Sequence, residues 1–432
     1  MILLILTLAI IIFPAECFSE LENVPFPARL IIYKAQKLMD EKKYTEAIEV
    51  LKRFKKKSEK LKPAEADKKG YTNYLIDFTL GNCFFMIGRY REAKKYYLAS
   101  VKKKSDFSTG WLNLAQCCYE LKEYLSAADA FLKTYKTSQK KKPDYLYFAA
   151  VSFLSAGKPS KALTVLNRLL RMNIPLKTEW KEAIAHSYIS CNRLKEALPF
   201  VEELSERTKG EKRRQWQQVR LHIYLSLNMD KKALSYLKRL LQEDPVQPKW
   251  WKGLAYLYLK KNHYKDALSA LIIKGFLEPL TDQEKRTAAQ LSMAIGIPKV
   301  ALDFYKSISK NNPSIMYHIA ICYLRLHRPE DSLWYVNKAL KKDPKQKKLL
   351  LLKGELLYQL KRYREAASVF EKAAESKVDP GRCYLMAGYS FWNVKDFKKA
   401  YLAFKQAAKY PLFRSSALRA LKLIRSATAL KR

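Results

Sequence analysis

Glycine is scarce in this chain of 432 residues, where it occurs only 12 times. Glycine supplies the unusual backbone angles of loops that wrap around phosphates, and no glycine-rich loop of that kind is present. The 17 prolines fall largely between apolar segments with helical periodicity. This composition predicts an almost wholly helical chain and gives no support to a nucleotide-binding site.

Histidine is also rare, with five residues. His186 and His222 recur at equivalent places of neighbouring segments, but a zinc site needs more ligands than these two. No Ser/His/Asp or Cys/His combination can be argued from residue spacing. We therefore predict a protein that is not an enzyme and that uses no metal or cofactor.

Acidic residues are half as frequent as basic ones. The chain has 41 Asp and Glu against 82 Lys and Arg, which gives a formal net charge of +41. Such an excess predicts attraction to anionic partners, whether acidic proteins, lipid head groups, wall polymers or nucleic acid. The charge alone does not choose among them.

The N-terminal segment reads as an export signal over residues 1–19. Ile2–Phe13 is apolar apart from Thr7, Pro14 ends the run, and Ala15–Ser19 offers small residues for cleavage. The run is too short to span a bilayer as a helix. No basic residue precedes it, and the first is Arg29, so a short N-terminal anchor is the alternative.

A small residue followed by an alanine twelve or thirteen positions later recurs about every 34 residues, which is the mark of a repeat protein. The small or apolar residue, here called the marker, falls at Ala35, Gly81, Ala115, Ala149, Ala185, Leu221, Ala255, Ala289, Ala320, Gly354 and Gly388. A larger apolar residue follows the second position by four residues, as at Tyr97, Phe370 and Phe404. Small residues let two antiparallel helices approach closely, and the large residue fills the space beside the crossing.

This pattern resembles the tetratricopeptide repeat family. The best matches are Trp111–Ala115 with Ala127 and Phe131, Gly354 with Ala366 and Phe370, and Gly388 with Ala400 and Phe404. The resemblance covers residues 27–410. It implies an all-α fold, a right-handed superhelical solenoid of about eleven helical hairpins, and a protein-binding scaffold rather than a catalyst.

Two segments depart from the register. Residues 55–70 hold extra residues between the first two hairpins and predict a longer loop or helix extension. Residues 411–432 carry Leu418, Leu421 and Ile424 at helical spacing, which predicts a capping helix over the last open face. A membrane-binding amphipathic helix is the alternative there.

The cysteines fit a buried position better than a disulfide framework. Cys83, Cys117 and Cys322 share one position on the first helix of their repeats. Equivalent positions of adjacent repeats lie roughly 8–10 Å apart, beyond the reach of a disulfide. We expect small, buried, reduced thiols.

In the resembled family the first helices line a concave groove that binds partner segments. Groove positions follow from the register, either one residue after the marker or three before it. They are rich in amides, aromatic rings and imidazoles, which suit contacts with a peptide. The predicted groove residues are Gln36, Asn82, Gln116, His186, His222, Lys252, Tyr256, Arg286, Gln290 and Tyr389.

Lysine clusters recur at or beyond the ends of second helices, and we call them the basic edge: Lys102, Lys103, Lys104, Lys140, Lys141, Lys142, Lys341 and Lys342. Cations at helix C-termini offset the helix dipole. The surplus predicts contact with anionic lipid or wall polymer, and nucleic acid only if the chain is not exported.

Together these features favour an exported bacterial scaffold, periplasmic or envelope-associated, that holds one or more partner proteins by peptide or helical segments. The alternative is a cytoplasmic adaptor associated with nucleic acid or a membrane surface through its basic edge. An enzyme on a repeat scaffold is a third possibility, but no residue pattern supports it.

Overall fold

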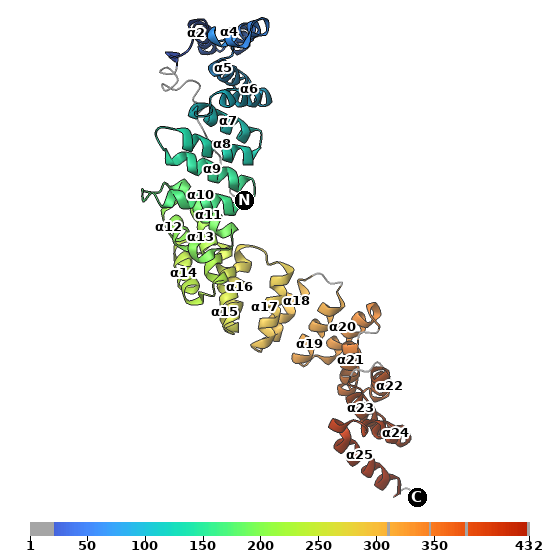
Figure 1. The fold of residues 1–432 in the computed structure, drawn as a ribbon. Helices are drawn as coiled ribbons and strands as arrows, with labels where there is room; N and C mark the ends of the chain where they lie inside the picture. Colours follow the sequence, from blue (N-terminus) through green and yellow to red (C-terminus); the bar gives the residue numbers. More distant parts are fainter. Residues whose placement is uncertain (1–20, 309–311, 345–346, 376–378, 430–432) are drawn as a thin grey trace. The chain divides into compact units, whose positions relative to one another are not determined.

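A computed structural model describes residues 21–308, 312–344, 347–375 and 379–429, and all regular secondary structure in these ranges is helical. The predicted all-α fold is confirmed. The chain forms two compact units, unit 1 up to Met229 and unit 2 from Asp230, whose helices are labelled in Figure 1. The predicted export signal, residues 1–19, lies outside the described residues.

Unit 1 is a series of antiparallel helices in which successive elements pack side by side. Its elements are α2 (Phe26–Asp40), α3 (Tyr44–Lys56), the 3-10 helix η1 (Lys57–Lys60), α4 (Pro63–Lys68), α5 (Tyr74–Met86), α6 (Tyr90–Lys103), α7 (Ser108–Glu120), α8 (Tyr124–Thr137), α9 (Pro143–Ser155), α10 (Pro159–Leu170), α11 (Thr178–Ser190), α12 (Leu194–Arg207) and α13 (Gly210–Ser226). One apolar core runs continuously from Leu21 to Ile223. This continuity is expected where each hairpin buries its apolar face against the next.

Unit 2 repeats the same plan. Its helices are α14 (Asp230–Glu243), α15 (Pro248–Lys260), α16 (Tyr264–Leu277), α17 (Asp282–Ala294), α18 (Pro298–Lys306), α19 (Pro313–Arg325), α20 (Pro329–Lys342), α21 (Lys347–Gln359), α22 (Tyr363–Glu375), α23 (Pro380–Asn393), α24 (Phe397–Ala407) and α25 (Pro411–Ala429). The first helix of each hairpin carries the marker residue, as α15 carries Ala255 and α23 carries Gly388.

The hairpin turns share one backbone device. The second residue after the first helix takes a left-handed conformation, with φ of 75° at Gly88, 59° at Asn262 and 60° at Lys395. This conformation ends a helix and satisfies its last carbonyl groups, and only glycine and asparagine adopt it without appreciable strain. The register alone did not show that several lysines occupy it.

The crossing of the two helices in a hairpin is as tight as the sequence predicts. A methyl group built on Gly81 would lie 2.6 Å from the ring of Tyr97, and one built on Gly354 would lie 2.6 Å from the ring of Phe370. The markers Ala115, Ala149 and Ala185 are fully buried. The small-and-large pairing is therefore confirmed as the packing rule of the hairpins.

Residues 55–70 fold into the short elements η1 and α4 rather than an open loop. Pro63 begins α4, where its fixed φ suits the first helical position. Gly70 follows with φ of 76°, and its Cα is so close to α2 that an added methyl group would meet Ala28 Cβ at 2.7 Å. The extra residues thus return the chain onto the first hairpin.

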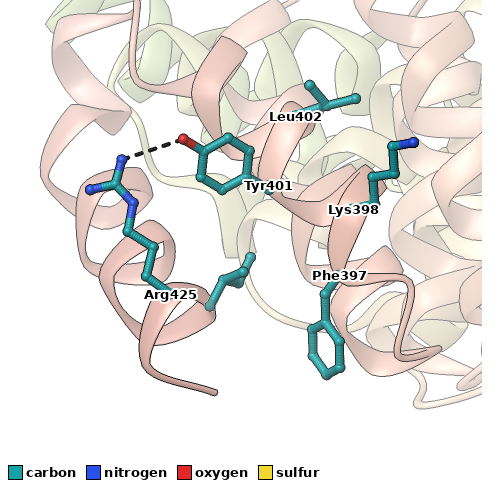
Figure 2. Close-up of a pocket in the computed structure, with 6 residues that line it drawn as sticks. Phe397, Lys398, Tyr401, Leu402 and Arg425 are labelled. Carbon is teal, nitrogen blue, oxygen red and sulfur yellow. Dashed lines mark hydrogen bonds between the residues drawn. The ribbon is translucent and has the colours of Figure 1, made fainter. Parts of the chain in front are cut away.

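Helix α25 packs on α23 and α24 at the end of the described chain. Its buried face consists of Ala417, Ala420, Leu421 and Ile424, and Arg425 Nη2 donates to Tyr401 Oη at 3.3 Å (Figure 2). Leu418 was predicted to belong to this face, but it is 53% exposed. One residue turns a helix by about 100°, so Ala417 takes the inward position in its place.

Candidate functional site

Two of the predicted groove residues of unit 1, Asn82 and Gln116, are buried inside the fold. Asn82 is 1% exposed, and its Oδ1 accepts hydrogen bonds from Tyr97 Oη at 2.8 Å and from Asn113 Nδ2 at 2.9 Å. Gln116 is 5% exposed. The groove prediction is therefore wrong for these two amides, because Asn82 joins two repeats by hydrogen bonds and neither amide is open to a partner.

The remaining unit 1 positions differ in accessibility. On α2, Gln36 donates to Asp40 Oδ1 at 2.9 Å. On α11, His186 is half-buried, and its ring lies 4.9 Å from the Trp216 ring. Burial lowers the pKa of His186 to about 4, so this imidazole is neutral near pH 7. On α13, His222 is exposed.

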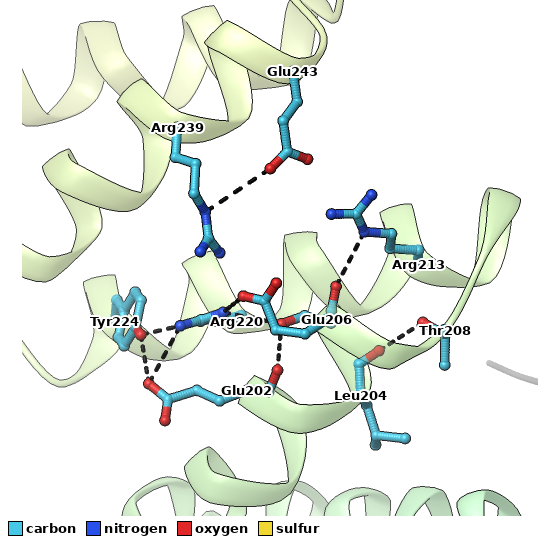
Figure 3. Close-up of polar contacts among 10 residues, drawn as sticks. Glu202, Leu204, Glu206, Thr208, Arg213, Arg220, Tyr224, Arg239 and Glu243 are labelled. Atoms are coloured by element: carbon cyan, nitrogen blue, oxygen red, sulfur yellow. Dashed lines mark hydrogen bonds and ion pairs between the residues drawn. The ribbon is translucent and has the colours of Figure 1, made fainter.

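Two carboxylates of unit 1, Glu202 and Glu206, balance the charge of Arg220. Arg220 Nη1 donates to Glu206 at 2.7 Å, and its Nε donates to Tyr224 Oη at 3.0 Å (Figure 3). Tyr224 in turn donates to Glu202 at 2.5 Å. Because its charge is matched by two carboxylates, we read this network as structural and not as an anion site.

Unit 2 exposes three of its predicted positions, Lys252, Tyr256 and Gln290. On α15, Tyr256 is 54% exposed, and on α17, Gln290 is exposed four residues after Arg286. Residues four apart share one side of a helix. The pairs Lys252 with Tyr256 and Arg286 with Gln290 therefore form two parallel rows on neighbouring first helices.

A buried carboxylate fixes the first of these rows. Glu284, on α17, forms ion pairs at 3.0 Å with Lys252 of α15 and with Lys274 of α16. It also accepts from the Thr281 backbone at 3.0 Å as part of a capping box. Burial raises the cost of the charge, but the bonds from Thr281, Lys274 and Lys252 outweigh it and lower the Glu284 pKa to about 2.

Next to these rows the structure assembles a cationic cluster that the sequence did not reveal. Arg286 and Lys348 both act on the half-buried His318 of α19, whose pKa is lowered by burial and then by these two charges. The His318 ring stacks 5.2 Å from Tyr305. Arg286 of α17 and Lys348 of α21 thus place two positive charges near His318 of α19, and these charges together with burial favour the uncharged form of its ring.

Arg286 has no acidic partner within 4.0 Å among the described residues, and its half-buried Nε lacks a hydrogen bond there. An unpaired buried donor costs about 1–3 kcal/mol, which a carboxylate would recover. We call this surface the cationic face of unit 2, defined as Lys252, Tyr256, Arg286, Gln290, His318 and Lys348.

Tyr389, the last predicted groove residue, lies on α23 and belongs partly to the core. It is half-buried, and its ring lies 5.1 Å from the ring of Phe404. Among the described residues, no hydrogen bond or ring contact joins Tyr389 to the residues of the cationic face.

The predicted basic edge divides into paired and exposed lysines. Lys103 Nζ lies 2.6 Å from Asp77 Oδ2 and 2.7 Å from the Thr72 carbonyl oxygen, and Lys104 lies over the Tyr74 ring at 5.0 Å. Exposed side chains are found at Lys102, Lys140, Lys141, Lys142, Lys341 and Lys342. An edge formed by these lysines stays a prediction, in which Asp77 matches the charge of Lys103.

No group of three or more His, Cys, Asp or Glu residues able to hold a metal ion occurs within the described ranges. The described cysteines are free thiols, and burial raises the pKa of Cys83, Cys117 and Cys322 to about 12. Such thiols are poor nucleophiles and poor ligands near neutral pH. No helix of the described chain is long and apolar enough to cross a membrane.

Comparison with known proteins gives matches to repeat proteins. The sequence profile of the tetratricopeptide repeat matches residues 78–144 and 317–380. A TPR repeat-containing protein of Methanocaldococcus jannaschii is 30% identical over 148 residues, which cover 34% of this chain and 24% of that protein. The chain thus matches about a quarter of the length of this relative.

Three solved structures are similar in fold. Naa15/Naa10 bound to HypK-THB has 14% identity and a TM-score of 0.42, covering 87% of this chain and 67% of that chain. YrrB, described as a TPR protein with an unusual peptide-binding site, has 19% identity and a TM-score of 0.37, covering 43% and 97%. A tetratricopeptide repeat protein of Parabacteroides merdae ATCC 43184 has 18% identity and a TM-score of 0.32, covering 65% and 98%.

One matched segment lies in each unit, and both contain a hairpin whose marker glycine faces an aromatic ring, Gly81 with Tyr97 and Gly354 with Phe370. The tetratricopeptide repeat profile therefore matches one segment of each unit, residues 78–144 in unit 1 and 317–380 in unit 2.

Proposed function

We propose that this chain is a non-enzymatic scaffold that binds an acidic segment of a partner protein on the cationic face of unit 2. Tetratricopeptide repeats are a protein-binding fold, and the observation that carries the proposal is the unpaired Arg286 beside His318 and Lys348. Arginine presents a planar set of donors that matches a carboxylate, and a half-buried site strengthens that contact.

The neighbouring residues suit a peptide backbone. Tyr256 offers a rigid exposed ring, and the exposed Gln290 can both donate to and accept from an extended segment. Lys252 is already paired with Glu284, so it orients the row more than it adds free charge. We therefore assign the attraction to Arg286 and Lys348 and the shape of the contact to Tyr256 and Gln290.

The proposal can be tested by selecting peptides from a displayed random library on the intact protein. We expect the selected sequences to be enriched in Asp and Glu, and the binding of a selected peptide to fall at least tenfold in Arg286→Gln. The control Lys238→Gln removes an exposed charge from the second helix α14 and should bind normally. Selected peptides without acidic residues, or equal binding by both variants, would reject the proposal.

We also propose that the scaffold acts in the bacterial cell envelope after export. The support is the apolar run Ile2–Phe13 followed by small residues, together with a net charge of +41 that suits an anionic surface. Mass spectrometry of the protein isolated from its own cells tests this point. A mature N-terminus at or beyond residue 16 agrees with export, whereas an intact Met1 on the isolated protein contradicts cleavage.

A further inference from the structure

The outward side of α25 combines leucines with positive charge and no negative charge. Leu412 is 85% exposed, Leu418 is 53% exposed and Leu423 is 59% exposed, although the opposite side of the same helix is buried on α23 and α24. The sequence of α25 contains no Asp or Glu. Capping the solenoid therefore accounts for one side of this helix and leaves the other unexplained.

The outward residues fall into two adjacent stripes. Leu412, Arg419 and Leu423 follow one another at spacings of seven and four, and Leu418, Lys422 and Arg425 follow at spacings of four and three. Both spacings bring residues to the same side of a helix. All six residues are therefore on the outward side of α25, each stripe contains both leucine and basic side chains, and all six are solvent-exposed.

The surface continues onto α24. A cavity of about 620 Å³ between the two helices is lined by Phe397, Lys398, Tyr401, Leu402, Ile424 and Arg425 (Figure 2). Leu402 at this cavity is 55% exposed, and Lys398 is again basic. Apolar and cationic groups therefore extend beyond one helix face, while no carboxylate lines the cavity.

We propose that the outward side of α25 is a docking surface for an anionic lipid membrane, on which the helix lies in the plane of the head groups. Interfacial helices place leucines at the boundary of the acyl chains and basic side chains among the lipid phosphates. Each Lys or Arg near an anionic surface strengthens binding by about fivefold. This inference is independent of the proposed protein-binding face, which lies on other helices.

An acidic helix of a partner protein is the competing occupant. Such a partner would need carboxylates opposite the cations, but it would also need apolar side chains complementary to three leucines spread over twelve residues. A fluid bilayer accepts that arrangement without complementary shape, and an anionic one matches the charge. Charge and shape together favour the membrane.

The test is flotation of the full chain with vesicles of phosphatidylcholine alone or mixed with phosphatidylglycerol. We expect binding to the mixed vesicles only, weakened by salt, and at least tenfold weaker in Leu412→Ser/Leu418→Ser/Leu423→Ser. A control that removes three exposed apolar side chains elsewhere, Leu125→Ser/Val246→Ser/Leu277→Ser, should float like the natural sequence; all six residues are exposed, so both variants should fold.

A second pair of variants separates α25 from the overall positive charge. Arg419→Glu/Lys422→Glu and the control Lys231→Glu/Lys232→Glu on α14 change the net charge equally. Loss of flotation in the α25 pair alone supports the proposal. Equal flotation of both pairs, or no binding of the natural sequence to mixed vesicles, would overturn it, and the latter result together with capture of an acidic peptide would point to the protein occupant.

Discussion

The ring of Phe404 lies against the backbone of Gly388, so closely that a methyl group on Gly388 would be 2.6 Å from two ring carbons. Gly388 lies on the first helix of the last hairpin and Phe404 on the second. This contact is the unit from which the solenoid is built, since it recurs between Gly81 and Tyr97 and between Gly354 and Phe370.

Gly388→Ala should therefore destabilise the protein, even though alanine is the better helix former. Overpacking a core costs typically about 1–3 kcal/mol, and the gain in helix propensity returns roughly 1 kcal/mol at most. We expect a net loss of about 1 kcal/mol in the free energy of unfolding, measured by denaturant titration. Phe404→Leu in the same chain should reduce the penalty of the alanine; an unchanged penalty would show that the ring is not its cause.

Removing Asp77 and removing its two lysine partners should lower the free energy of unfolding by different amounts. This carboxylate is fully buried on α5 and is paired with Lys55 of α3 and Lys103 of α6, which are about one third exposed. Lys55→Ala/Lys103→Ala leaves a buried charge without a partner and should cost about 3–5 kcal/mol. Asp77→Asn leaves two lysines that can regain water, so its cost should be smaller.

Urea titration of these variants measures the difference. The double exchange Lys102→Ala/Lys140→Ala removes two exposed lysines and provides the control. A loss in Asp77→Asn equal to or greater than that of the double lysine variant would contradict the assigned burial.

Asn82 should behave as a structural residue and not as a binding residue. Asn82→Ala leaves the hydroxyl of Tyr97 and the amide of Asn113 without their shared acceptor, which should cost about 1–3 kcal/mol of unfolding free energy. Binding of an acidic peptide to unit 2 should not change. Calorimetry of both properties checks this, and reduced affinity with unchanged stability would restore Asn82 to the binding site.

Glu284 gives a pH dependence with a definite sign. Its folded-state pKa of about 2 is below the ordinary value of 4.5, so its contribution to stability is complete above about pH 4.5 and is lost as the pH falls toward 2. Glu284→Gln should destabilise the protein by about 1.5–3 kcal/mol near pH 7, because hydrogen bonds to a charged group are lost.

The difference in stability between the natural sequence and Glu284→Gln should shrink as the pH falls through this window. Glu330→Gln removes the same charge from an exposed position of α20 and serves as the control. Unfolding midpoints measured across the acid range provide the comparison. A difference that stays constant down to about pH 2 would show that the carboxylate is not held by Lys252 and Lys274.

The periodic part of the fold could be predicted from the sequence because hairpin packing repeats the same small and large residues. Gly354 with Phe370 is one example, and the crossing follows from residue size alone. The side of a helix is known only to within about one residue from periodicity, and α25 shows the consequence, since Ala417 is buried where Leu418 was expected.

The site was harder to predict because it depends on contacts between different repeats. Asn82 looked like a free amide until Asn113 of the next repeat was found to donate to it. Lys103 looked like part of the basic edge, although it pairs with Asp77, 26 residues away. Conversely, no spacing rule linked Arg286 and Lys348 to His318, whose pKa both charges lower from other first helices of unit 2.

The most direct test of the cationic face is photocrosslinking in the native cells. A benzophenone side chain at Gln290, in otherwise natural sequence, should capture a partner protein whose crosslinked peptide is rich in Asp and Glu. The yield should fall strongly when Arg286→Glu is added, whereas Lys238→Glu should leave it unchanged. An equal yield with both substitutions, or a crosslinked peptide without acidic residues, would contradict the account.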